Sequence, residues 1–146
     1  MVERARPAEF AGTWYPADAG SCDRFLDGVA AYDGTTLGAR ARGAIVHHAG
    51  WTYSGAIAFR ALRALRESSP EADLILVFGG HLTARDRPRL FLDGAWDTPY
   101  GEIEIAREIA QDIGMSVECE AETSSEYQED NAVEVLLPMV KKLWPS

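Results

Sequence analysis

The sequence is short of cysteine, and it lacks any long apolar run. Its two cysteines, Cys22 and Cys119, stand far apart without a second cysteine or a histidine at metal-ligand spacing, which argues against a zinc knuckle. We interpret them as reduced packing residues, with a disulfide as the alternative. No run approaches the roughly 20 apolar residues of a membrane-spanning helix, and the first residues do not resemble a signal peptide. We therefore expect a cytoplasmic protein without a membrane partner.

Basic residues are also scarce. The 14 lysines and arginines face 23 acidic residues, which leaves a formal net charge of -9 at pH 7. This charge repels phosphate backbones, so we expect no nucleic-acid partner. The length of 146 residues suits one domain over residues 1–146, with a core of ordinary size.

Two apolar stretches with a helical pattern between them predict a βαβ unit. Residues 43–47 are typical of a short buried strand, and Ser54 is suited to cap a helix with apolar positions up to Leu65. Residues 73–78 form a continuous apolar run that ends at Gly79-Gly80, the pattern of a strand covered on both faces. A helical crossover makes the two strands parallel. We expect an α/β fold, with a mostly parallel or mixed sheet flanked by helices.

The remaining segments predict further helices and a hairpin around this unit. A helix begins at Ser21 and ends at Asp33-Gly34, and Ser68-Ser69-Pro70 stops the helix of the βαβ unit. The other expected elements are a loop over 11–16, a hairpin of 89–92 and 95–96 turning at Asp93-Gly94, a helix over 105–113 ended by Gly114, a strand over 115–120, and a helix over 132–143 interrupted at Pro138.

Two of the three histidines follow the two predicted parallel strands. His48 comes just after the first strand and His81 just after the second. The carboxyl ends of neighbouring parallel strands lie about 4.8 Å apart, and ligands of open α/β sheets collect there. Because neutral imidazole suits iron, copper and zinc, we predict that both histidines bind one metal ion. The alternative is a pair of hydrogen-bonded structural histidines.

Other polar residues are candidates for the same pocket. Successive strand side chains point to opposite faces, so we assign His47 to the surroundings of the pocket or to packing. Tyr53 lines the pocket or, alternatively, caps the core. At the start of the last predicted helix, Asp130 is a candidate lining residue, and Asn131 and Glu134 are candidate catalytic residues; the alternative is a solvated acidic face.

Five motifs along the chain form a recognisable set. They are AGTWYP at 11–16, HAGWTYSG at 48–55, GGH at 79–81, TPYG at 98–101, and DNAVEVLLP at 130–138. Together they resemble the Memo-like proteins (mediator of ErbB2-driven cell motility), known in prokaryotes as the B component of the AmmeMemoRadiSam system. The resemblance runs from about Arg6 to Val140.

The resemblance implies an α/β fold related to the LigB-like class III extradiol dioxygenases, with a pocket for iron or copper. Carried over by position, His48 and His81 are two of its metal ligands. Asn131 stands where the family has a histidine, and an amide binds metal weakly. His47 stands where the family usually has proline. Family members continue into further strands that contribute a cysteine and a histidine, so this chain corresponds to the N-terminal half of their fold.

Two functions follow as hypotheses. The first is a Memo-like protein that uses iron, copper or zinc in redox chemistry on a small molecule, with hydrolysis by a metal-bound water as a weaker variant. The second is a non-catalytic binding or scaffold protein that has lost the metal site. Because an incomplete sheet leaves an unpaired edge and exposed apolar surface, we also expect a homo-oligomer or a separately encoded partner chain.

Overall fold

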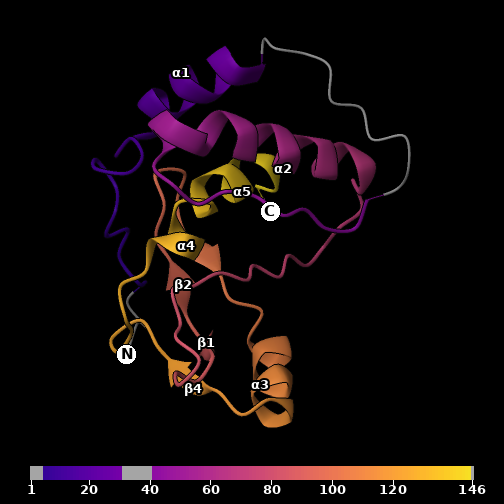
Figure 1. Cartoon of the computed structure of the whole chain (residues 1–146). Coiled ribbons are helices and arrows are strands. Elements are labelled where there is room, and N and C mark those ends of the chain that lie inside the picture. Colours follow the sequence, from indigo (N-terminus) through magenta and orange to yellow (C-terminus); the bar gives the residue numbers. More distant parts are fainter. Residues whose placement is uncertain (1–4, 31–40, 146) are drawn as a thin grey trace.

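The computed structural model describes residues 5–30 and 41–145, which form a helical layer at one end and small sheets at the other (Figure 1). The helices are α1 (Ala19–Ala30), a single π-helical turn η1 (Trp51–Gly55), α2 (Ala56–Ser68), α3 (Arg107–Ser116), α4 (Asn131–Glu134) and α5 (Leu137–Leu143). The strands are β1 (Arg89–Phe91), β2 (Ala95–Trp96), β3 (Ile103–Glu104) and β4 (Glu120–Glu122). None of the helices within these described ranges has the length and apolar character needed to cross a bilayer.

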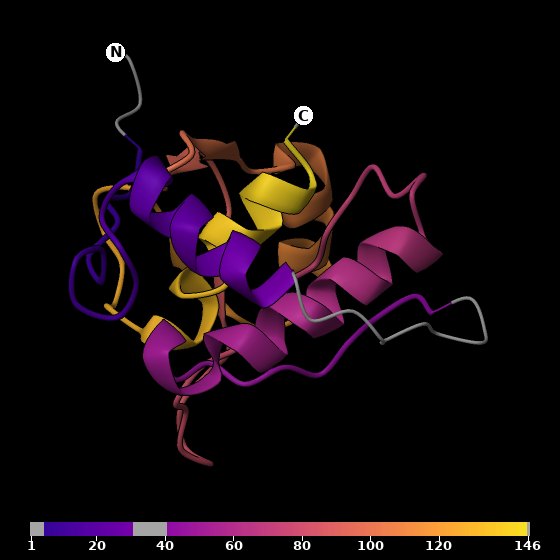
Figure 2. The same cartoon turned by 90° about the horizontal axis from the view of Figure 1, so that it is seen from above.

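The core lies among α1, α2 and α5, which Figure 2 shows from above. Each helix turns an apolar stripe inward, and the centre of the cluster includes the fully buried Leu26 and Met139. Burying a side chain of this size contributes about 2 kcal/mol to folding. Cys22 lies in the same core and is not bonded to Cys119, as the sequence predicted. Burial raises the pKa of the Cys22 thiol to about 11, so it stays protonated at neutral pH.

The strands form two separate pairs. β1 pairs with β4 in parallel, with Leu90 opposite Ala121, and β2 pairs with β3 in antiparallel, with Trp96 opposite Ile103. The predicted hairpin between 89–92 and 95–96 is therefore wrong. The chain does turn at Gly94, which adopts a positive φ of 92°, but α3 packs on β1 and brings β4 beside it. The α/β class is confirmed in a coarse form, as small sheets flanked by helices.

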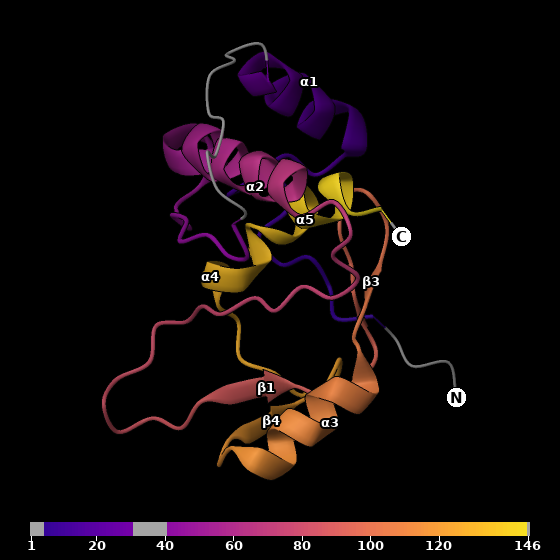
Figure 3. The ribbon, with the colours of Figure 1, turned by 90° about the vertical axis from the view of Figure 1, so that its right-hand side faces the viewer.

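The two predicted parallel strands at 43–47 and 73–78 are wrong as regular strands. In both segments the chain is extended but pairs with no strand among the described residues (Figure 3). Burial alternates along the second segment, where Ile75 and Val77 pack on the helical core and Phe78 is 87% exposed. In the first segment Val46 packs on the core, whereas residues 43–45 are exposed. The inward positions therefore hold the segments against the helices, although no strand within residues 5–30 and 41–145 pairs with their backbone.

Several helix ends differ from the prediction. Helix α2 ends at Ser68 as expected, but Ser54 does not cap it, because its hydroxyl donates to the Ala49 carbonyl oxygen at 3.2 Å. Helix α1 begins at Ala19, and its predicted end at Asp33-Gly34 lies outside the described residues. Helix α3 runs through Gly114 rather than ending there, so the following strand, β4, begins later than predicted. The last helix is divided into α4 and α5, with Pro138 in the first turn of α5, and the predicted interruption is confirmed.

Candidate functional site

His48 and His81 lie side by side, as the sequence predicted. Their Nε2 atoms are 3.3 Å apart, and the ring planes are inclined at 79°. The prediction placed them at the ends of two paired parallel strands, but the extended segments that carry them are not paired among the described residues. His81 is exposed to solvent, and His48 is half-buried. The pair therefore offers two nitrogen atoms to a single ligand.

The carboxylate of Asp130 forms hydrogen bonds with both the backbone and the ring of His81. Its carboxylate accepts from the His81 backbone N–H at 3.0 Å and from the His81 Nδ1 at 3.1 Å, and it also accepts from the Ala132 N–H at 2.7 Å as the cap of α4. Burial raises the pKa of Asp130, but these hydrogen bonds outweigh it and leave the pKa below its ordinary value. We assign the proton to Nδ1 from this network, which leaves the lone pair of His81 on Nε2.

Glycine allows the His81 segment to come this close to α4. A Cβ atom on Gly79 would lie 3.1 Å from the backbone carbon of Ala132, which is tighter than ordinary contact. Gly80 has a φ of 142°, a conformation that side chains disfavour. The GGH motif therefore has a local physical reason, since it seats His81 against the start of α4.

A cavity of about 350 Å³ opens beside His81. Asp130 and Asn131 line it, as do two residues that sequence reasoning missed, Arg89 and Gln128. The other lining residues are Phe10, Leu82, Asp86 and Glu129. This volume suits a small molecule, and its walls are mainly polar.

Glu134, a predicted catalytic residue, is not among the residues that line this cavity. Its side chain is 1% exposed, and its Oε1 accepts from the Phe10 N–H at 2.7 Å and the Tyr15 hydroxyl at 2.8 Å. Burial raises the pKa of Glu134, although these hydrogen bonds oppose the shift. Glu134 therefore anchors the loop of residues 11–16 to α4.

Tyr53 and His47 also lie outside the cavity lining. Tyr53 is 86% exposed because η1 turns it outward while Trp51 and Ser54 point into the protein. It therefore neither lines this cavity nor caps the core. His47 is exposed, on the opposite side of its segment from the half-buried His48, as strand alternation predicted.

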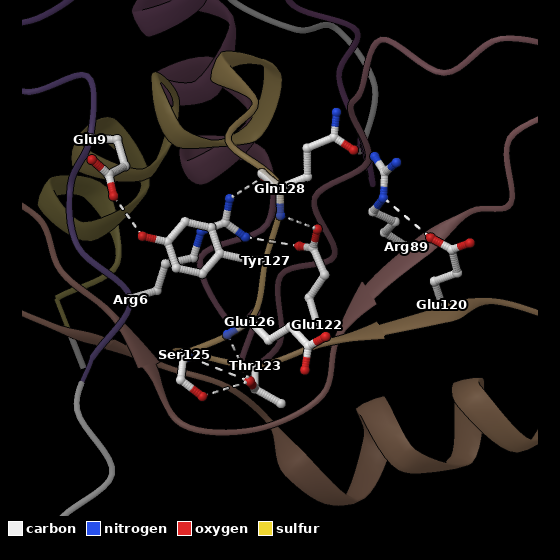
Figure 4. Close-up of polar contacts among 10 residues, drawn as sticks. All are labelled: Arg6, Glu9, Arg89, Glu120, Glu122, Thr123, Ser125, Glu126, Tyr127 and Gln128. Atoms are coloured by element: carbon white, nitrogen blue, oxygen red, sulfur yellow. Dashed lines mark hydrogen bonds and ion pairs between the residues drawn. The ribbon is translucent and has the colours of Figure 1, made fainter.

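A buried arginine orders the segment that leads to Asp130. Arg6 is 2% exposed, and its guanidinium lies 3.8 Å from the centre of the Trp96 ring and 4.1 Å from that of Tyr127. It donates to the Glu122 carboxylate and to the Gln128 carbonyl oxygen, both at 2.9 Å (Figure 4). No spacing signal in the sequence connects Arg6 to these distant partners.

Comparison with known proteins decides the family. The sequence pattern described as Memo-like protein matches residues 6–146. The chain belongs to the Memo-like family. The resemblance read from the five motifs is thus confirmed.

Several archaeal members of the Memo-like family are similar to the chain. A MEMO1 family protein of Methanococcoides burtonii is 33% identical over 104 residues, which is 71% of this chain and 37% of the relative. One from Methanosarcina barkeri is 30% identical over 93% of this chain and 49% of the relative, and one from Methanosarcina acetivorans is 30% identical over 96% and 49%. The chain spans about half the length, or less, of these relatives.

The predicted metal site of the Memo-like chain has two candidate donors in this structure. Among residues 5–30 and 41–145, no group of three or more histidine, cysteine, aspartate or glutamate side chains is placed to hold one ion. His48 and His81 lie side by side, and Asp130 accepts a hydrogen bond from the Nδ1 of His81. Glu134 instead contacts the N-terminal loop. The roles of the two histidines as ligands stay a prediction.

Proposed function

We propose that this Memo-like chain binds one transition-metal ion between His48 and His81 and takes part in redox chemistry on a small molecule. The observation that carries the proposal is the 3.3 Å separation of the two Nε2 atoms. Metal-bound imidazole nitrogens lie about 2.1 Å from the ion, so two nitrogens at this separation would subtend an angle of about 104°. This value is close to the tetrahedral angle of about 109°, so the separation is compatible with a shared ion. Without an ion, the same two atoms are at the distance of a hydrogen bond between the rings.

The hydrogen bond between the Asp130 carboxylate and the Nδ1 of His81 supports the same proposal. Metal-binding histidines usually donate their other ring N–H to a carboxylate or carbonyl oxygen, which fixes the ring and raises its basicity. Asp130 accepts from His81 Nδ1 in this way. Two imidazoles supply two of the three or four donors of a tight site, and water or substrate would have to complete the set.

Bound iron or copper would supply one-electron and oxygen chemistry, whereas zinc would polarise a carbonyl group or a water. The residues of the chain itself would bind the ion and orient the substrate. His48 and His81 would hold the ion, and Asp130, which accepts from His81 Nδ1, would keep the Nε2 lone pair of His81 available to it. Arg89 and Gln128 line the adjacent cavity and offer hydrogen-bond donors to a polar substrate.

The test is a metal titration with a matched histidine control. Wild-type protein titrated with Cu²⁺, Zn²⁺ or anaerobic Fe²⁺ is expected to take up one ion per chain. His48→Ala and His81→Ala are expected to lose this binding, whereas His47→Ala, which removes the exposed neighbour, is expected to keep it. Wild-type protein without stoichiometric binding of any of the three, or unchanged binding in both site variants, would overturn the proposal.

A non-catalytic binding or scaffold role is the second candidate. The observation that favours it is the exposed apolar side of the extended segments, where Ile45, Leu76 and Phe78 face solvent. This function requires no metal. It predicts that the His48→Ala and His81→Ala variants behave like the wild type in every assay of association.

A further inference from the structure

The start of α4 contacts the segments of both histidines. Asp130 accepts from the backbone and the ring of His81, and the next residue, Asn131, donates from its side-chain Nδ2 to the backbone carbonyl oxygen of His48 at 2.8 Å. The segments that carry the two histidines share no strand pairing within the described residues. Two consecutive residues, the N-cap and the first residue of α4, therefore hold the segments of both histidines.

The loop around His48 has other hydrogen bonds, but they act farther along the chain. Ser54 Oγ donates to the Ala49 carbonyl oxygen at 3.2 Å, and the Trp51 N–H donates to the Trp14 carbonyl oxygen at 2.8 Å. These bonds hold the turn after His48. The bond from Asn131 reaches His48 itself, and it comes from the element that also holds His81.

From this arrangement we infer that Asn131 is the positioning residue for His48, and that it maintains the distance between the two imidazoles. The inference rests on the proposed function, because it concerns the same histidine pair. Asn131 acts through His48 and is not itself required as a ligand. The residue type matters: an amide donates a hydrogen bond to a carbonyl oxygen, whereas a carboxylate of the same size only accepts.

The chemistry also gives a reason for asparagine at this position. The resemblance places a histidine here in the family, and its replacement removes a candidate ring from the pocket. In this chain Asn131 instead supplies a hydrogen-bond donor to the backbone carbonyl oxygen of His48. A site of two imidazoles depends strongly on such support, because productive geometry must be held to about 0.5 Å.

The test compares Asn131→Asp with Ser54→Ala in copper-loaded protein. Asn131→Asp keeps the size of the side chain and is tolerated in the first turn of a helix, where acidic residues are favoured, so the variant is expected to fold. It is expected to weaken Cu²⁺ binding by about 10- to 100-fold and to change the copper electron paramagnetic resonance spectrum. Ser54→Ala removes a neighbouring bond to a carbonyl oxygen and is expected to stay within about twofold of the wild type, with an unchanged spectrum.

Either of two results would overturn the inference. One is an Asn131→Asp variant with the affinity and spectrum of the wild type. The other is a Ser54→Ala variant that loses as much affinity as Asn131→Asp, since any disturbance of the loop would then have the same effect.

A metal-free measurement separates this inference from the proposed function. In ¹⁵N NMR spectra of the histidine rings without metal, Asn131→Asp is expected to shift the His48 signals, while Ser54→Ala leaves them in place. His47 serves as the internal reference in both spectra. If the wild type binds no metal, the proposed function fails, but these shifts still decide the inference. Unchanged His48 signals in Asn131→Asp would overturn it.

Discussion

At the scale of single residues, Glu134 has a buried carboxyl group whose two oxygens are satisfied unequally. One carboxyl oxygen accepts two hydrogen bonds, and the other, Oε2, is buried without a partner among the described residues. The raised pKa means that the folded protein binds the proton more tightly than the unfolded chain. Between the unfolded pKa, near the ordinary value of 4.5, and the higher folded pKa, stability must fall as pH rises.

Replacing this carboxyl with an amide is expected to remove that pH dependence. Glu134→Gln keeps the acceptor for Phe10 and Tyr15 but cannot ionise. Urea unfolding of both proteins from pH 4 to pH 7 is expected to show the wild type losing stability relative to the variant as the pH rises. The exposed Glu126→Gln serves as the control and should follow the wild type. A stability difference that is flat, or that moves in the opposite direction, would contradict this assignment.

Arg6 is expected to contribute far more to stability than an exposed arginine in an ion pair. Arg6→Met leaves the nearly buried Glu122 carboxylate without its cation, and breaking a buried pair costs about 3 to 5 kcal/mol. Arg87 pairs with Glu118 at 3.0 Å on the surface, where such pairs are worth at most about 1 kcal/mol. Urea unfolding of Arg6→Met and Arg87→Met measures both effects. Equal losses of stability in the two variants would contradict the claim that burial makes the Arg6–Glu122 ion pair stronger than a surface pair.

At the level of the elements, helices were easier to predict than strands. The apolar stripe around Leu26 in α1 and Pro138 in the first turn of α5 are local signals, because a helix satisfies its own backbone. Strands depend on partners that are distant in sequence. Asp93-Gly94 indicated a hairpin, yet β1 pairs with β4 and β2 with β3. The apolar run at 73–78 remains extended without a partner strand in the described residues.

Two glycines in helices are expected to respond to alanine in opposite ways. A Cβ atom on Gly55 would lie 2.9 Å from the Trp51 Cβ and 3.1 Å from the Phe25 ring, so Gly55→Ala overpacks the junction of η1 and α2. Such a change costs about 1 to 3 kcal/mol. Among the described residues, no atom outside the neighbouring backbone of α1 lies within 4 Å of a Cβ placed on Gly28, and Gly28→Ala is expected to add up to about 1 kcal/mol of stability.

Thermal unfolding of the two variants checks the sign of each change. Gly55→Ala should melt below the wild type and Gly28→Ala above it. A Gly55→Ala protein as stable as the wild type would show that the turn after His48 can yield, and would weaken the account of how that histidine is placed.

At the scale of the whole molecule, two stretches of the chain lack charged side chains. Residues 43–59 and 74–84 contain no aspartate, glutamate, lysine or arginine, although the chain carries a net charge of -9. This region includes the exposed Ile45, Leu76 and Phe78. We propose that a second copy of the chain covers it, because two such copies meet there without like-charge repulsion.

Light scattering after size-exclusion chromatography tests this association. The wild type at tens of micromolar is expected to have the mass of a dimer, and Phe78→Asp that of a monomer. Met115→Asp is the control, since Met115 is exposed on α3, outside this region. A monomeric wild type, or a Met115→Asp variant as disrupted as Phe78→Asp, would contradict the proposal.

The candidate site was predictable only in its central pair. His48 and His81 were found from their places after two apolar runs, and they do meet. The hydrogen bonds of Glu134 could not be predicted, because its partners, Phe10 and Tyr15, come from the opposite end of the chain. Arg89 was missed for a similar reason, since its place beside the cavity depends on the pairing of β1 with β4. Contacts between residues so far apart in the sequence produce no local pattern from which they could be predicted.

The central claim is that one ion is shared by the two imidazoles. Anomalous diffraction from crystals grown with Zn²⁺ or Cu²⁺, recorded at the absorption edge of the metal, tests it most directly. The account predicts a single peak about 2.1 Å from Nε2 of both His48 and His81. The absence of a peak there, or a metal bound by only one of the two rings, would contradict it.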